Sequence, residues 1–97
     1  MAETDPHDLS RVHIWVTGRV QGVGFRAFVL QAGTFLELSG WVHNLSYDQV
    51  ETVAEGSHLV LERFFELVKT GPRAARVDEA RVEWETPTGE FHRFDVK

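Results

Sequence analysis

Cysteine is absent from this sequence of 97 residues, and its absence excludes several kinds of chemistry. A chain without cysteine forms no disulfide, binds no metal through thiolate and has no cysteine nucleophile. The five histidines show no spacing typical of a metal site, so we expect no bound metal. Residues 1–10 also lack the apolar stretch of a secretory signal. Together these features favour a cytoplasmic location.

Long apolar runs and an excess of positive charge are missing too. No run of about 18 apolar residues is present, and we therefore expect no membrane association through a spanning helix. The chain has 15 acidic and 10 basic residues, which gives a formal net charge of −5. Because nucleic-acid binding needs a basic surface to neutralise phosphates, the acidic balance argues against it and favours a small ligand.

The residues that are present predict a single domain with one modest core. Of the 97 residues, 42% are hydrophobic, which is enough to form one core. The chain is too short to form two. Residues 1–10 are polar and acidic, and we expect them to form a flexible tail. The domain itself is expected over residues 11–97.

Hydrophobic periodicity predicts the order β-α-β-β-α-β, followed by one short extra strand. The expected strands cover residues 11–17, 40–45, 50–55, 77–85 and 91–96. A first helix is expected from Phe25 to about Leu38, and a second between an N-cap at Ser57 and a stop at Gly71-Pro72. This order is typical of an α+β ferredoxin-like sandwich, in which two helices cover one face of an antiparallel sheet.

The stretch from Gly18 to Arg26 joins the first strand to the first helix and contains three glycines. Glycine permits positive φ and close approach of backbone N–H groups, and a helix N-terminus supplies unpaired donors that suit an anion. Arg26 would lie in the first helical turn, where a cation is disfavoured by about 0.3–1 kcal/mol. A bound oxyanion would compensate for that cost. On the glycines alone, a plain glycine-rich connection with a solvent-facing arginine is the favoured interpretation, because no dinucleotide or nucleotide-binding motif follows.

A second motif, Gly40-Trp41-Val42-His43-Asn44, makes the pattern more specific. Together with the Gly18–Arg26 stretch, it resembles the two signatures of the acylphosphatase family. Gly71-Pro72, followed by Ala75 and Val77, is similar to the family's passage from helix to strand. The resemblance covers about residues 11 to 97. It implies a hydrolase that cleaves acyl phosphates to a carboxylate and inorganic phosphate, with no metal or organic cofactor. Separately, we expect the protein to be a monomer.

The resemblance also implies roles for individual residues. The substrate phosphate would be bound by the backbone of Gln21, Gly22, Val23, Gly24, Phe25 and Arg26. Arg26 would add its side chain as a clamp, and Asn44 would orient the attacking water. These roles suit the chemistry, because a carboxylate leaves without a strong general acid and the reaction then needs mainly positioning and charge stabilisation. A phosphate oxygen of the substrate would accept the proton of the water.

Two positions depart from the family's pattern. Asp48-Gln49 stands where the family usually has Asp-Gly after the second motif, and this makes the turn beside Asn44 an open question. Glu37 stands where the family often has glycine near the end of the first helix. Glu51 and Glu55 share one side of a strand and have no acid/base partner in either motif, so we expect both to be solvated.

Two other functions are compatible with the same predicted fold. The first is a module that binds a small anion at the glycine-rich stretch and catalyses nothing. The second is an RNA-binding domain that stacks bases on sheet aromatics such as Trp15 and Trp41. The acidic balance argues against the second, and an assay for released phosphate distinguishes the first from an enzyme.

Overall fold

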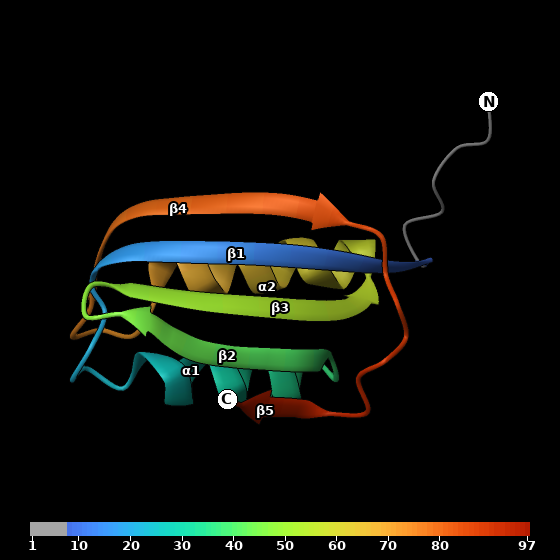
Figure 1. The fold of residues 1–97 in the computed structure, drawn as a ribbon, viewed down its shortest axis with the longest axis horizontal. Coiled ribbons are helices and arrows are strands. Elements are labelled where there is room, and N and C mark those ends of the chain that lie inside the picture. The colour runs from blue at the N-terminus through green and yellow to red at the C-terminus, as the bar shows by residue number, and fades with distance from the viewer. Residues whose placement is uncertain (1–7) are drawn as a thin grey trace.

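The computed structural model describes residues 8–97 as one five-stranded sheet with two helices on one face (Figure 1). The elements are β1 (Leu9–Arg19), α1 (Phe25–Phe35), β2 (Ser39–Ser46), β3 (Gln49–Ser57), α2 (His58–Thr70), β4 (Arg76–Glu85) and β5 (Phe94–Val96). Their order confirms the predicted α+β ferredoxin-like fold with a short extra strand at the C-terminal end. Neither helix in this range is long and apolar enough to cross a membrane.

The sheet is mixed, and in this it differs from the expected antiparallel sheet. Its strand order is β4-β1-β3-β2-β5, and the first four strands pair antiparallel as predicted. β5 pairs parallel with β2, with Phe94 opposite Gly40. The reason is the connection over residues 86–93, which crosses from β4 at one edge of the sheet to β2 at the other (Figure 1). β5 therefore begins at Phe94, three residues later than expected.

The core lies between the helices and the sheet. Alternate residues of β1 point to this side, and Val12, Ile14 and Val16 are fully buried, as the period-2 pattern predicts. The other buried apolar side chains of this core include Val42, Val50, Phe25, Val29, Leu61, Phe64 and Val68. We call the opposite side, which carries Trp15 and Trp41, the open face of the sheet.

The sheet starts earlier in the chain than the predicted domain boundary at residue 11. β1 begins at Leu9, which pairs with Ser57, so Leu9 and Ser10 belong to the sheet and not to the expected tail. The pairing extends this far because β3 also runs on to Ser57. The remainder of the predicted tail, residues 1–7, lies outside the described residues.

Local chemistry explains where α2 begins and where α1 ends. The Ser57 side chain accepts a hydrogen bond from the N–H of Val60, which confirms the predicted cap of α2. α1 ends at Phe35 and not near Leu38, because Glu37 adopts a left-handed φ of 57°. The N–H groups of Glu37 and Leu38 then bond back to Thr34 and Gly33. Helices usually end in this pattern with glycine, which accounts for the family's preference at position 37.

Candidate active site

The loop between β1 and α1 takes its shape from its two glycines, and a third glycine lies just before it in β1. Gly22 and Gly24 have φ values of 70° and 77°, in the left-handed region that other residues rarely adopt. Gly18 has a different role. A Cβ atom there would overlap the carbonyl oxygen of Arg76, so glycine permits the close pairing of β1 with β4. We call residues 20–26 the phosphate loop.

The N-terminus of α1 is left uncapped by side chains. Gly24 is the N-cap residue, and no side chain among residues 8–97 caps the first turn by a hydrogen bond. The first helical bond runs from the N–H of Phe28 to the carbonyl of Gly24 (3.0 Å). The N–H groups of Phe25, Arg26 and Ala27 therefore have no partner within the helix, and the helix dipole adds partial positive charge there. This is a favourable place for an anion.

Arg26 is available to a ligand. Its side chain belongs to an exposed residue, and no ion pair among residues 8–97 involves it. Arg11, by contrast, is surrounded by carboxylates. The guanidinium of Arg26 can therefore bind two oxygens of an incoming oxyanion without breaking an existing contact.

Asn44 lies near the end of β2 and carries an unusual buried atom. Its side-chain oxygen Oδ1 is buried, and within residues 8–97 it has no hydrogen-bond partner. An unsatisfied buried polar group costs about 1–3 kcal/mol, and most such groups have a partner in native proteins. The unpaired oxygen therefore indicates a place where a water or ligand donates a hydrogen bond.

The phosphate loop and Asn44 line the same cavity, although 17 residues of sequence lie between Arg26 and Asn44. The cavity has a volume of about 410 Å³ and is lined by Val20, Gln21, Gly22, Gly24, Phe25, Arg26, Ala27, Leu30, Asn44 and Val96. Of the predicted site residues, only Val23 is not part of this lining, and its side chain packs against the core. The lining contains no carboxylate and no histidine side chain.

Sequence reasoning missed the apolar wall of this cavity. Leu30 lies three residues after Ala27 and four after Arg26 on α1, and this helical spacing could have indicated that it shares their face. Val96 could not have been found in this way. It reaches the cavity because β5 pairs with β2, and that pairing joins residues more than 50 positions apart.

The turn after Asn44 resolves the open question about Asp48-Gln49. Tyr47 and Asp48 form a two-residue turn, and the pairing of β2 with β3 shifts register between Asn44 and Ser46, which is a β-bulge. Among the described residues other than glycine, only Glu37 has positive φ. The turn therefore belongs to neither hairpin type that requires positive φ, and position 49 needs no glycine.

Two hydrogen bonds join the region of the phosphate loop to this turn. The Gln21 amide Nε2 donates to the carbonyl oxygen of Ser46 (2.6 Å), and the N–H of Gly18 donates to the carbonyl oxygen of Asp48 (2.9 Å). The Ser46 hydroxyl in turn donates to the Asp48 carboxylate (3.0 Å). The chain segments that carry Arg26 and Asn44 are thus in direct contact beside the cavity.

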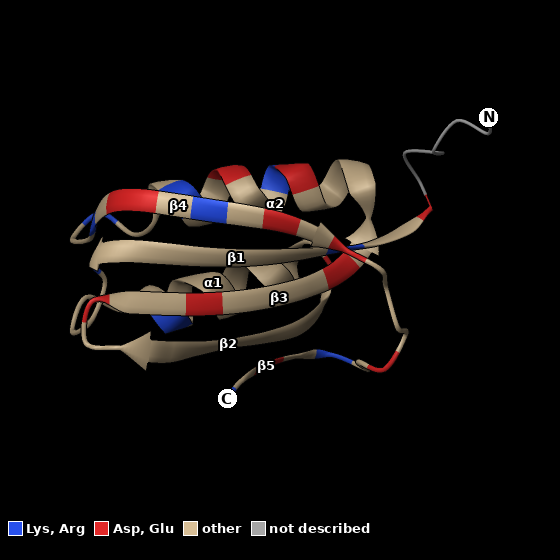
Figure 2. Ribbon diagram, turned by 45° about the horizontal axis from the view of Figure 1, so that its top comes forward, with Lys and Arg blue, Asp and Glu red and all other residues tan. Residues whose placement is uncertain are grey.

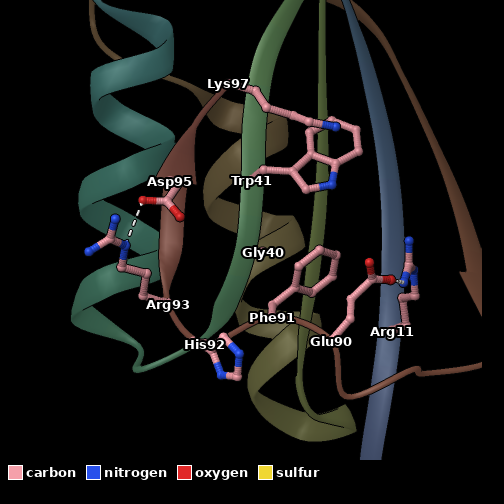
Figure 3. Close-up of a pocket in the computed structure, with 9 residues that line it drawn as sticks. All are labelled: Arg11, Gly40, Trp41, Glu90, Phe91, His92, Arg93, Asp95 and Lys97. Carbon is pink, nitrogen blue, oxygen red and sulfur yellow. Dashed lines mark hydrogen bonds and ion pairs between the residues drawn. The ribbon is translucent and has the colours of Figure 1, made fainter.

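A larger hollow on the open face has different chemistry (Figure 3). Its volume is about 760 Å³, and aromatic side chains of Trp41 and Phe91 line it together with charged groups. Two of its cations, Arg11 and Arg93, are paired with carboxylates, and it includes neither the phosphate loop nor Asn44. Size alone would favour this hollow, but the smaller cavity combines an uncapped helix N-terminus with Arg26, which forms no ion pair among residues 8–97.

Glu51 and Glu55 are not solvated as the sequence led us to expect. Glu51 lies between two histidines, with its oxygens 2.5 Å from His13 Nε2 and 2.6 Å from His43 Nε2. Burial opposes its ionisation, but the bonds to His43 and His13 outweigh burial and hold the pKa of Glu51 below its ordinary value. Glu55 is buried and accepts hydrogen bonds from backbone N–H groups of residues 88 and 89. Neither carboxylate lines the cavity, and the described residues hold no cluster of three or more groups able to bind a metal.

Trp15 on the open face is already in contact with other side chains. His13 stacks on Trp15 with ring centroids 3.7 Å apart, and the Arg81 guanidinium lies 4.1 Å from the same ring. Because His13 and Arg81 both pack on the indole of Trp15, a base would have to displace one of them to stack there. Acidic residues also occupy several positions along β4 and β3 (Figure 2). Repulsion of phosphates would therefore accompany any contact with this face.

Comparisons of sequence and of structure with known proteins point to the same protein family. A sequence model of the acylphosphatase family matches residues 12–96. An acylphosphatase of Chloroflexus aurantiacus is 41% identical over 89 residues, which are 92% of this chain and 97% of that relative. One from Trichormus variabilis is 45% identical over 94 residues, covering 97% of this chain and 92% of that relative. The crystal structure of acylphosphatase from Bacillus subtilis superposes with a TM-score of 0.86 at 39% identity, covering 93% of this chain and 99% of that one.

Proposed function

This chain belongs to the acylphosphatase family and is a hydrolase of acyl phosphates, and we propose that the cavity between the phosphate loop and Asn44 is its active site. The observation that carries the proposal is the buried, unpaired Oδ1 of Asn44, in a cavity that also holds the unpaired Arg26 and an uncapped helix N-terminus. One part of the cavity suits a phosphate, and the other suits a water molecule.

The phosphate group binds to the loop in this proposal. Backbone N–H groups from Gln21 to Arg26 donate to its oxygens, and the left-handed conformations of Gly22 and Gly24 let the backbone turn around it. The Arg26 guanidinium adds a bidentate contact and stabilises the negative charge of the transition state. Val23 contributes through its backbone, since its side chain packs inward.

Asn44 positions the nucleophile. Its Oδ1 accepts a hydrogen bond from the attacking water, so that an oxygen lone pair points to phosphorus opposite the acyl group. A neutral amide performs this role better than a carboxylate, because it adds no negative charge beside the phosphate. Holding the water in line with the breaking bond lowers the activation barrier by a large amount in such reactions.

The substrate itself accepts the proton in this mechanism. The cavity lining has no carboxylate or histidine that could act as a general base or acid. The phosphorus–oxygen bond to the acyl group breaks, the bond to the water oxygen forms, and the proton of the water moves to a phosphate oxygen. The carboxylate leaves as an anion and needs no proton. We propose that no metal or organic cofactor takes part.

The experiment measures phosphate release from benzoyl phosphate in the presence of a chelator. We expect Arg26→Ala and Asn44→Ala each to lower kcat about 10²–10³-fold, the usual loss for a group that stabilises the transition state. Arg19→Ala is the matched control, because Arg19 is an exposed arginine of the same motif that does not line the cavity. Wild-type rates in both cavity variants would disprove this assignment of the site.

Location, oligomeric state and partners are proposed from the sequence. We propose a cytoplasmic monomer whose partners are a small acyl phosphate and inorganic phosphate, with no nucleic acid or membrane partner. Sedimentation of the purified protein at micromolar concentration measures its oligomeric state.

A further inference from the structure

The two halves of the proposed active site are carried by strands that are not neighbours. The phosphate loop follows β1, Asn44 belongs to β2, and β3 lies between these strands in the sheet. No ladder of backbone hydrogen bonds therefore connects the loop directly to Asn44. The loop residues 20–24 also lie outside any helix or strand. Some other contact must set the distance between the bound phosphate and the water that attacks it.

Gln21 supplies a contact at this place. It lies within the phosphate loop and lines the cavity, and its Nε2 donates to the carbonyl oxygen of Ser46 over 2.6 Å. Ser46 is only two residues from Asn44, and the β-bulge falls between them. The bond from Gly18 to Asp48 is less direct, because Gly18 still belongs to β1 and precedes the loop.

We propose that the side chain of Gln21 is a positioning residue for acyl phosphate hydrolysis, which acts by tying the phosphate loop to the strand that carries Asn44. The inference rests on the proposed active site. Gln21 touches the strand through its side chain and the phosphate through its backbone, so it couples the two halves directly. A shift of about 1 Å between water and phosphorus is enough to slow such a reaction by about 100-fold.

The geometry explains why glutamine suits this position. The contact needs a donor, because the Ser46 carbonyl can only accept. Asparagine would be one methylene too short, and an ionised glutamate would place a second acceptor against the carbonyl. Methionine has nearly the same length and shape but no donor, which makes it the sharpest replacement.

The experiment compares Gln21→Met with Gln49→Met. Gln49 is a glutamine of the β2–β3 hairpin that Gln21 contacts, and its amide donates to Thr17 Oγ1 without lining the cavity. We expect Gln21→Met to lower kcat for benzoyl phosphate about tenfold, within the range for a small misalignment. Its inhibition constant for inorganic phosphate and its melting temperature should stay near wild type, because the loop still binds phosphate. Gln49→Met should keep the wild-type kcat.

Gln21→Glu adds a readout that a purely structural role would not change. A protonated carboxyl can donate to the Ser46 carbonyl, whereas an ionised one cannot. The kcat of Gln21→Glu relative to wild type should therefore recover as the pH falls through the glutamate range near 4.3. Gln21→Met has no titrating group, and its relative kcat should stay low at every pH.

Several outcomes would overturn the inference. A wild-type kcat in Gln21→Met, or an equal loss in Gln49→Met, would remove the positioning role. A higher inhibition constant for phosphate that accounts for the whole loss would make Gln21 a phosphate ligand only. If Arg26→Ala and Asn44→Ala stay active, the proposed site itself fails. If they are inactive while Gln21→Met is normal, only the present inference fails.

Discussion

Single residues in this protein accept unfavourable conformations or environments at two places, and only one of them is at the cavity. Asn44 keeps a buried oxygen without a partner, at a cost of about 1–3 kcal/mol. This cost is consistent with a site that binds water or substrate, because stability is often lost where function needs a free polar group. Glu37 is strained as well, but it lies exposed at the end of α1 and does not line the cavity.

The strain at Glu37 leads to a stability prediction. Its φ of 57° costs a side-chain-bearing residue about 1–2 kcal/mol, whereas glycine adopts it freely. Part of the gain is offset because glycine makes the unfolded chain more flexible. We expect Glu37→Gly to raise the free energy of unfolding by about 0.5–1 kcal/mol in urea titrations, with kcat unchanged.

A matched substitution on the same helix should have the opposite sign. Gln31 is exposed within α1, where glycine costs about 1 kcal/mol. Gln31→Gly should therefore lower the free energy of unfolding. If Glu37→Gly is also destabilising, the left-handed conformation at position 37 does not strain the native protein.

At the scale of elements, four strands are linked by a chain of side chains on the open face. Glu51 of β3 bonds to His13 of β1 and to His43 of β2, and His13 also bonds to Glu85 of β4. Because hydrogen bonds from His43 and His13 lower the pKa of Glu51 despite its burial, the folded state favours the ionised carboxylate. Glu51 therefore stabilises the fold at pH values above its unfolded pKa. That contribution is lost as the pH falls through the lowered folded pKa.

The corresponding prediction compares the wild type with Glu51→Gln between pH 7 and pH 3. The wild type should have the larger free energy of unfolding at pH 7, and the difference should shrink as the pH falls below about 4.5. Urea unfolding at several pH values measures it. Glu62→Gln, which changes an exposed ion pair with His58 on α2, should alter the profile much less. A difference that is independent of pH would contradict this account of Glu51.

Elements that depend on local chemistry were the ones that the sequence predicted well. Ser57 and Gly71 mark the ends of α2 because a cap acts within one helical turn. The motifs around Arg26 and Asn44 could be recognised for the same reason, as short strings of residues. The parallel pairing of β5 and the place of Val96 in the cavity could not, because they depend on contacts between distant segments. The bulge beside Asn44 was likewise hidden, since it is a property of two paired strands.

For the whole molecule, the structure separates the proposed catalytic end of the sheet from a structural clamp at the opposite end. The phosphate loop follows the last residue of β1, whereas Arg11 and Glu55 face each other near its start. Glu55 is buried, pairs with Arg11, and accepts hydrogen bonds from the N–H groups of Thr88 and Gly89. It thereby anchors the connection that leads the chain across the sheet to β5 (Figure 1).

Because Glu55 holds Arg11 and the connection to β5, we expect its removal to lower stability without lowering the catalytic rate. Glu55→Ala leaves the largely buried guanidinium of Arg11 with weaker pairing and two backbone donors without their acceptor. We expect the free energy of unfolding to fall by about 3 kcal/mol in urea titrations, as when one partner of a buried pair is removed. Because Arg26 and Asn44 lie at the other end of the sheet, kcat should stay near wild type wherever the variant is folded.

A comparison with Glu85→Ala separates burial from charge. Glu85 also pairs with Arg11, but its side chain is 33% exposed, whereas that of Glu55 is 1% exposed. Water can replace much of what Glu85 provides, so its loss should cost about 1 kcal/mol or less. Equal losses in the two variants would mean that charge balance around Arg11 matters more than the buried bonds to the connection. A fall in kcat for Glu55→Ala under folded conditions would show that the two ends of the sheet are coupled.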